Sequence, residues 1–257
     1  MAIQTRESVL EHFGVGPVGN LVRRSSACVL LVLACSGCSD ESVVAGSTVQ
    51  LQCPDTPVLH TGEATYYTFA SGAGACMFDS TPNDLMVGAM NRIDYAGSAL
   101  CGACVRVTGP KGTILIRVVD LCPECPRGNI DLSPLAFSGI GDTSLGHVPI
   151  TWSIIPCGYT APIVYHFNDG SSQWWTAVQI RGSRNPIFSL EYRTSQHLFQ
   201  NVQRADFNYF IEPSGMGPGP YTFRVTDAFG HVLVDSAISL VVDGDVSGHA
   251  QFPPCGP

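Results

Sequence analysis

The stretch Asp120-Leu-Cys-Pro-Glu-Cys-Pro-Arg-Gly-Asn-Ile-Asp131-Leu-Ser-Pro134 guides the interpretation of the whole chain. It places two acids, Asp120 and Asp131, on either side of a Pro- and Gly-rich segment that favours turns. A carboxyl group can accept hydrogen bonds, or donate one when it is protonated. Two structural roles compete with a functional one: Asp131 could help to cap a helix, and Asp120 could satisfy backbone amides in a turn.

Elements with clear local signals flank this stretch. Ser133 followed by Pro134 predicts an N-capped short helix over residues 133–137. Two β-branched runs, 105–107 and 114–119, are separated by Gly-Pro-Lys-Gly and predict a hairpin. Residues 151–157 are typical of a closing strand, and 158–162 of a short joint. Alternating strands are then expected at 175–180, 187–192, 221–225 and 231–234. The chain is therefore predicted to be all-β and divided into two domains.

Composition excludes some partners. Only 13% of the 257 residues are charged, while Gly (27) and Pro (18) are plentiful, which favours turn-rich β structure. The formal net charge is -8, so the chain lacks the positive field that holds nucleic-acid phosphates. The same charge repels acidic polysaccharides. Neutral glycans are the easier target on electrostatic grounds.

The beginning of the chain has the pattern of an export signal. Arg23-Arg24 precedes the apolar run 27–34, which is too short to span a membrane, and small residues follow up to Cys38. Residues 1–38 are expected to be a secretory or lipoprotein signal, and residues 39–58 a linker. Leu33-Ala34-Cys35 resembles a lipobox, so a lipid anchor through Cys35 or Cys38 and free secretion are both considered. The protein is thus expected to be secreted or a cell-surface lipoprotein.

Eight cysteines follow the signal, and an even number in an exported chain predicts disulfides. Cys101-Gly-Ala-Cys104 and Cys122-Pro-Glu-Cys125 also have the spacing of a zinc ribbon. An oxidising compartment pairs thiols before they can hold a metal, so disulfides are preferred and no metal site is assigned. The disulfide candidates are Cys53, Cys76, Cys101, Cys104, Cys122, Cys125, Cys157 and Cys255.

The stretch 120–134 is similar to the signature of the first domain of expansins, and four further segments resemble the same family in the same order. They are the opening strand 62–66, the cysteine pair 101–104, the tandem tryptophans of 170–175 and the C-terminal strand 248–253. The resemblance implies a six-stranded double-psi β-barrel over residues 59–158. It also implies an immunoglobulin-like, carbohydrate-binding β-sandwich over residues 159–257.

The resemblance also implies two sets of site residues. In the barrel groove these are Thr65, Asp120 and Asp131, with Asp131 in the place of the essential acid. In the second domain the aromatic side chains of Trp174, Trp175 and Phe207 stack on sugars, since flat apolar rings need no charge for this. The tryptophans could instead be core residues. Neighbours on a regular strand point to opposite faces, so both line one surface only if Trp174 precedes the strand or a bulge intervenes.

The sequence departs from the family pattern in the barrel groove and in the second domain. Cys122 stands where the family has a sugar-stacking Tyr, which suggests a disulfide role for it. By family pattern, Cys76 is expected to pair with Cys101, and Cys104 with Cys157. In the second domain, Asn168 replaces a basic residue of bacterial relatives.

The function implied by the resemblance is loosening of cellulose or related glucans without hydrolysis. Inverting glycosidases need a second carboxylate, and the opening strand Thr65-Tyr-Tyr-Thr68 supplies none. Glu63, Asp79, Asp84 and Asp94 remain possible bases, although none of them lies in a recognisable motif. The alternatives are a weak glycoside hydrolase or lytic transglycosylase on the same barrel, or a barwin-like defence or protease-inhibitor module. We expect a monomer that binds cellulose or another neutral wall polysaccharide without a cofactor.

Overall fold

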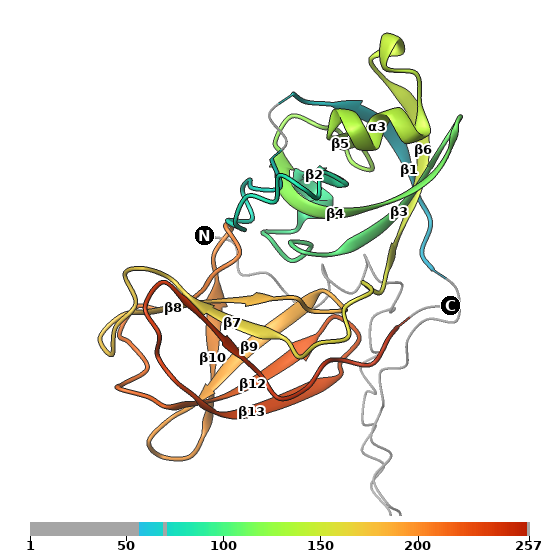
Figure 1. Ribbon diagram of the computed structural model, residues 1–257. Coiled ribbons are helices and arrows are strands. Elements are labelled where there is room, and N and C mark those ends of the chain that lie inside the picture. Colours follow the sequence, from blue (N-terminus) through green and yellow to red (C-terminus); the bar gives the residue numbers. More distant parts are fainter. Residues whose placement is uncertain (1–56, 69–70, 256–257) are drawn as a thin grey trace, which may run out of the picture.

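The computed structural model describes residues 57–68 and 71–255, which form two β domains (Figure 1). The predicted all-β fold is confirmed: a closed six-stranded barrel is followed by an eight-stranded second domain. The expected signal over 1–38, most of the linker and Cys53 lie outside the described residues. Within the described part of the chain, no helix has the length and apolar character needed to cross a membrane.

The first domain is a barrel closed in the strand order β1-β5-β2-β4-β3-β6. Pairs β1–β5 and β2–β4 are parallel, whereas β3 and β4 form the predicted hairpin around Pro110-Lys111. The bounds are β1 His60–Tyr66, β2 Val87–Asn91, β3 Cys104–Gly109, β4 Gly112–Cys122, β5 Ile130–Leu132 and β6 Val148–Ile155.

Short helices connect the barrel strands: α2 Arg92–Tyr95, α3 Pro134–Ile140 and the 3-10 turn η1 Thr143–Leu145. The helix predicted at Ser133-Pro134 is α3, and Ser133 Oγ accepts the Ala136 N–H at 3.0 Å as its N-cap. Because Ser133 fills this role, the alternative in which Asp131 caps the helix is wrong.

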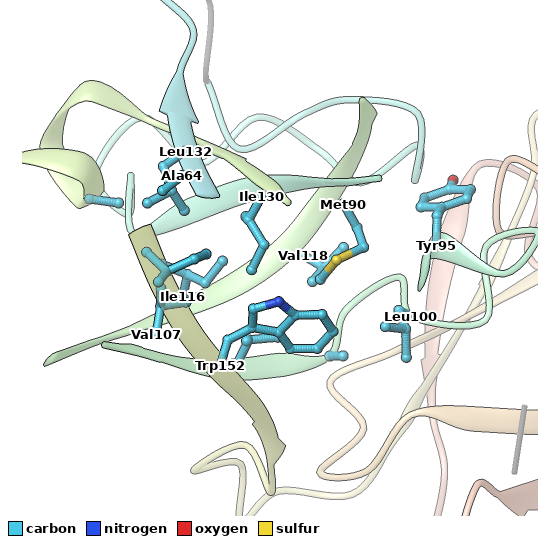
Figure 2. Packing of buried hydrophobic residues seen from close by; sticks show 14 of the residues in the cluster. Ala64, Met90, Tyr95, Leu100, Val107, Ile116, Val118, Ile130, Leu132 and Trp152 are labelled. Carbon is cyan, nitrogen blue, oxygen red and sulfur yellow. The ribbon is translucent and has the colours of Figure 1, made fainter. Parts of the chain in front are cut away.

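The barrel interior is filled by alternate residues of its strands, grouped around Trp152 (Figure 2). Trp152 is 1% exposed, and its indole N–H donates to the Gly128 carbonyl at 2.7 Å. Ala64 on β1 and Ile130 on β5 point into this core. Since side chains alternate along a strand, the following residues, Thr65 and Asp131, point outward.

The second domain has the strand order β13-β12-β9-β10-β11-β8-β7-β14. Strand β10 pairs with β9 through residues 199–202 and with β11 through 203–204, so it links two layers. Tyr165 of one layer and Phe223 of the other have ring centroids 5.0 Å apart in the core between them. The bounds are β7 Val164–Phe167, β8 Thr176–Arg181, β9 Ile187–Arg193, β10 Phe199–Arg204, β11 Phe210–Glu212, β12 Tyr221–Asp227, β13 Val232–Ile238 and β14 Gly244–Ser247.

Some predicted strand positions need correction. The closing strand of the barrel is β6, which ends at Ile155 and not at Cys157. The C-terminal segment 248–253 contains no strand, because β14 ends at Ser247. Two backbone hydrogen bonds still join this segment to Ile163, one from Gly248 N and one to Ala250 O. The chain therefore continues alongside β7 without forming a regular ladder.

All four cysteines of the two Cys-x-x-Cys pairs are in disulfides. Cys76 is bonded to Cys101 and Cys104 to Cys157, which are the two pairings implied by the family resemblance. Cys122 is bonded to Cys125, and Cys255 is also in a disulfide. The four sulfurs that could have formed a zinc ribbon are thus oxidised, so the zinc alternative is wrong.

The two domains touch through side-chain to backbone hydrogen bonds. Tyr95 Oη donates to Asp206 O, and Ser98 Oγ donates to Ala205 O, both at 2.8 Å. From the other side, Gln179 Nε2 donates to Cys76 O at 2.9 Å. The first two contacts join the α2 region of the barrel to the turn at 205–208 of the second domain, and the third joins β8 to the barrel loop at 74–76.

Candidate functional site

The barrel carries a row of four residues across neighbouring strands β1, β5, β2 and β4. Thr65 pairs with Asp131, Asp131 pairs with Ala89, and Ala89 pairs with Asp120. Paired residues on adjacent strands project from the same face of a sheet. The structure therefore brings Thr65, Asp131 and Asp120 together, with the small Ala89 as a floor between the two acids.

Asp131 lies at the centre of this row. Thr65 Oγ1 donates to its Oδ1 at 2.6 Å. Burial raises the pKa of Asp131 above its ordinary value; the Thr65 hydrogen bond lowers it in part, and the charge of Asp120 adds to the rise. This carboxyl therefore holds its proton to a higher pH than an ordinary Asp, and in the protonated form it can donate a hydrogen bond.

The two carboxylate oxygens of Asp120 have different surroundings. Its Oδ1 accepts the N–H of Ala75 at 2.7 Å and of Leu121 at 2.8 Å, so the backbone-amide role considered for it is real. Its second oxygen has no hydrogen-bond partner among the described residues. Asp120 can thus hold the loop at 74–76 in place while one oxygen faces a ligand.

Tyr67 is a groove residue that the sequence did not point to. It follows β1 directly, and its backbone N–H donates to Leu132 O at 3.0 Å. Burial raises its pKa well above that of an ordinary tyrosine, and the charges of Asp120 and Asp131 add to this effect. Its hydroxyl is buried and has no partner among the described residues. A buried hydroxyl without a partner is costly, so this one points to a ligand group that satisfies it.

The other acids named as possible bases lie in different surroundings. Asp94 is fully buried, where its carboxylate accepts from Asn91 and from the Gly128 N–H. Asp79 pairs with Arg181 of the second domain at 2.8 Å, and Asp84 lines a pocket beside it. Glu63 is exposed on β1 and contacts His147 at 3.5 Å. Of these four, only Glu63 projects from the same face of β1 as Thr65.

The tandem tryptophans both precede β8, which starts at Thr176. The condition under which two neighbours can line one surface is therefore met. Trp174 is 74% exposed and is not a core residue. Trp175 is half-buried, and its ring lies next to Gly170, where an added Cβ would come within 3.5 Å of it.

Phe207 is 46% exposed and lies on the turn that meets the barrel. Its ring centroid is 6.2 Å from that of the buried Tyr209. Three hydrogen bonds hold the turn to the barrel: those from Tyr95 and Ser98, and one from Asn208 Nδ2 to Cys76 O at 3.3 Å. The position of Phe207 is thus set by the first domain as well as by its own.

Chemically, these surfaces offer uncharged or protonated hydrogen-bonding groups beside flat rings. A carboxyl, a hydroxyl and a phenol can exchange hydrogen bonds with sugar hydroxyls, and exposed indoles stack on the C–H faces of sugar rings. In residues 57–68 and 71–255, no group of three or more His, Cys, Asp or Glu residues is arranged to hold a metal ion. The uncharged hydrogen-bonding groups and the exposed rings suit a neutral glycan.

Comparison with known proteins identifies related sequences. A family model for double-psi β-barrels, described as "Lytic transglycolase", matches residues 60–152. Expansin-YoaJ of Bacillus subtilis (strain 168) is 37% identical over 204 residues, covering 76% of this chain and 87% of the relative. Expansin-like protein 1 of Dictyostelium discoideum is 29% identical over 195 residues, covering 70% and 68%.

Solved structures agree with these sequence matches. The crystal structure of the apo expansin of Clavibacter michiganensis superposes with a TM-score of 0.71 at 31% identity, covering 76% of this chain and 99% of that one. A mutant of that expansin in complex with cellohexaose gives the same TM-score of 0.71. Identity and coverage at this level, together with the barrel and the second β domain, show that this chain belongs to the expansin family.

Proposed function

We propose that this chain loosens cellulose-like wall polysaccharide by disrupting the non-covalent contacts between glucan chains, without hydrolysing them. The single observation that carries the proposal is the row of Thr65, Asp131, Ala89 and Asp120 on one face of the barrel. A protonated Asp131 and the hydroxyl of Tyr67 compete there for hydrogen bonds that otherwise join one glucan chain to the next.

The second domain supplies attachment in this proposal. Trp174, Trp175 and Phe207 are proposed to stack on the sugar rings of a glucan chain, which requires no charge on the protein or the ligand. The cellohexaose complex of the Clavibacter michiganensis relative supports a cello-oligosaccharide as the ligand class. The net charge of -8 favours neutral over acidic wall polymers.

The arrangement of the acids supports loosening over hydrolysis. An inverting glycosidase places its acid and its base on opposite sides of the scissile bond, with room for water between them. Two strand spacings, about 9.5 Å, separate Asp131 from Asp120, which is at the upper limit for an inverting pair, but the two acids project from one face of the sheet. They therefore meet the same side of a bound chain, and Asp120 Oδ1 is already engaged by two backbone amides.

The test is to incubate the purified protein with filter paper and measure tensile strength together with reducing sugar. The expected result is weakening without sugar release, and its loss in Asp131→Ala. Glu63→Gln is the control for a hydrolytic base on the same face, and it is expected to weaken paper as well as the wild type does. Steady release of sugar that is lost in Glu63→Gln would mean that the protein is a glycosidase.

The description of the barrel family as a lytic transglycolase makes a second activity worth measuring. A transglycosylase cleaves the glycan of peptidoglycan, so soluble muropeptides would accumulate when purified cell-wall sacculi are the substrate. We expect none above the level of an Asp131→Ala sample. Their appearance would replace the loosening proposal by an enzymatic one.

Export is also proposed, on the basis of the apolar run at 27–34 and of the disulfides in the barrel. Two forms of export fit the segment: free secretion, and a lipid anchor through Cys35 or Cys38. Labelling of producing cells with radioactive palmitate separates them. Label that is lost in Cys35→Ser or in Cys38→Ser identifies the anchored form and its attachment site, whereas unlabelled protein in the medium identifies free secretion.

A further inference from the structure

A second concave site lies in the second domain, between the β9–β10 hairpin and the loop at 216–220. This cavity of about 490 Å³ falls within the range of small-ligand pockets. Its walls combine hydroxyl and amide side chains, including Thr194 and Gln200, with the apolar Met216 and Pro220. Arg193 is the only charged residue among its described lining.

Two hydroxyls in this cavity lack partners. Tyr192 is only 9% exposed and its ring belongs to the core of the domain, but its hydroxyl oxygen is accessible and makes no hydrogen bond with the described residues. Burial raises the pKa of Tyr192, and the charge of Glu212 adds to the rise, so the hydroxyl stays protonated and remains a donor. Thr194 Oγ1 is buried and also has no partner among the described residues. A ligand with hydroxyl groups would satisfy both.

The cavity is continuous with the segment that carries the tandem tryptophans. Gly217 N donates to Gln173 O at 3.1 Å, and Met216 N donates to Thr176 Oγ1 at 3.2 Å. Gly215 has a φ of +75°, and a Cβ there would come within 2.1 Å of Gln173 O. Only glycine permits this approach, so the loop that forms one wall of the cavity lies directly against the residues flanking Trp174.

We infer that this cavity is a separate saccharide subsite, which binds a sugar unit of a neutral β-glucan beyond the tryptophans. The inference rests on the proposed function for the class of ligand, but it uses different residues. A sugar hydroxyl can accept from Tyr192 Oη and exchange a hydrogen bond with Thr194 Oγ1. Met216 and Pro220 offer apolar contact to the sugar C–H groups. The net charge of -8 on the whole chain favours a neutral ligand over an acidic one.

The experiment titrates ¹⁵N-labelled protein with cellohexaose and follows the backbone amides by NMR. In the wild type, the amides at 193–196 and those of Gly217 and Gly219 are expected to shift together with those at 170–175. The double variant Tyr192→Phe with Thr194→Val removes two hydroxyls at nearly constant volume. It should lose the shifts at 193–196 and bind cellohexaose about threefold to tenfold more weakly, as expected for losing hydrogen bonds of ordinary strength.

The matched control is Thr226→Val on β12, outside the cavity, which should bind like the wild type. Thermal unfolding of each variant checks that the fold is retained. If cellohexaose at saturation shifts no amide at 193–196 or 217–219, or if the double variant binds with wild-type affinity, the subsite does not exist. If Trp174→Ala with Trp175→Ala leaves the affinity unchanged while the cavity variant lowers it, the proposed tryptophan platform fails and the subsite stands.

Discussion

The ionised form of Asp131 lowers the stability of the folded protein, and the direction of the pKa shift of Asp131 predicts how stability varies with pH. Its pKa is higher in the folded than in the unfolded chain, so the folded state binds the proton more tightly. The stability that this provides is present below the ordinary pKa of Asp and is lost as the pH rises through the folded-state value. Asp131→Asn should therefore gain stability relative to the wild type at pH 7 but not at pH 3, as measured by urea unfolding.

The same shift predicts the pH dependence of activity. Because only the protonated carboxyl donates a hydrogen bond, paper weakening by the wild type should increase as the pH falls through the native pKa of Asp131. Asp131→Asn keeps a donor and should lose this pH dependence, while Asp131→Ala should lose about tenfold or more in activity at every pH. Equal pH profiles for the wild type and Asp131→Asn would mean that another group titrates.

Removing the hydroxyl of Tyr67 is expected to have opposite effects on stability and on activity. Its buried hydroxyl has no partner in the protein, so Tyr67→Phe removes an unsatisfied group and keeps the ring. The variant should be more stable by about 1 kcal/mol, and it should weaken paper less than the wild type. Urea unfolding and the tensile assay measure the two effects. A loss of stability would show that the hydroxyl already has a hydrogen-bond partner in solution and does not require a ligand to supply one.

At the scale of the strand, the groove depends on a small residue between two acids. Ala89 on β2 is 3% exposed and lies in register with Asp131 on one side and Asp120 on the other. Ala89→Leu would fill the floor of the groove and reduce paper weakening, while binding to cellulose through the tryptophans should remain. Overpacking costs about 1–3 kcal/mol, so thermal unfolding must accompany the assay. Thr113→Leu, at an exposed position of β4, is the control and should be fully active.

The elements that could be predicted from the sequence are those with local signals. The hairpin around Pro110-Lys111 and the cap of α3 at Ser133 depend on residues close together in the chain, and both are present. Strand β5 has only three residues, which is too few to show an alternation of apolar and polar residues, and it pairs with β1 and β2, which are distant in the sequence. The alignment of Ala89 with Asp120 also depends on an irregularity between Gly88 and Ala89.

The same distinction explains what was missed in the site. Asp131 belongs to a sequence motif of a known family, so the sequence points to it. Tyr67 belongs to no such motif, and only the tertiary structure shows that its hydroxyl is buried near Asp120 and Asp131. The cavity beside Tyr192 is assembled from the β9–β10 hairpin and the loop at 216–220, which are well separated in the sequence. Such contacts depend on tertiary structure, and single-sequence patterns carry no information about them.

At the scale of the whole molecule, the question is whether the groove and the aromatic surface act as one unit. The turn that carries Phe207 is bonded to the barrel through Tyr95 Oη and Ser98 Oγ, each at 2.8 Å. Arg204 at the start of the same turn donates from Nη1 to Ser98 O at 3.0 Å. In the proposed function, these bonds hold a glucan chain that stacks on Phe207 at a fixed place relative to Asp131.

Removing two of these bonds tests this coupling. Tyr95→Phe with Ser98→Ala should weaken the contact between the domains by about 2 kcal/mol, since each hydrogen bond contributes about 1 kcal/mol. Cellulose pull-down, which is proposed to depend on Trp174 and Trp175, should be retained. Paper weakening should fall, because a bound chain is no longer presented to the groove in one orientation. Calorimetry should show the unfolding transition broadening or splitting as the domains uncouple. If the variant loosens paper as well as the wild type does, the domains act independently, and binding serves only to raise the local concentration of the barrel at the glucan surface.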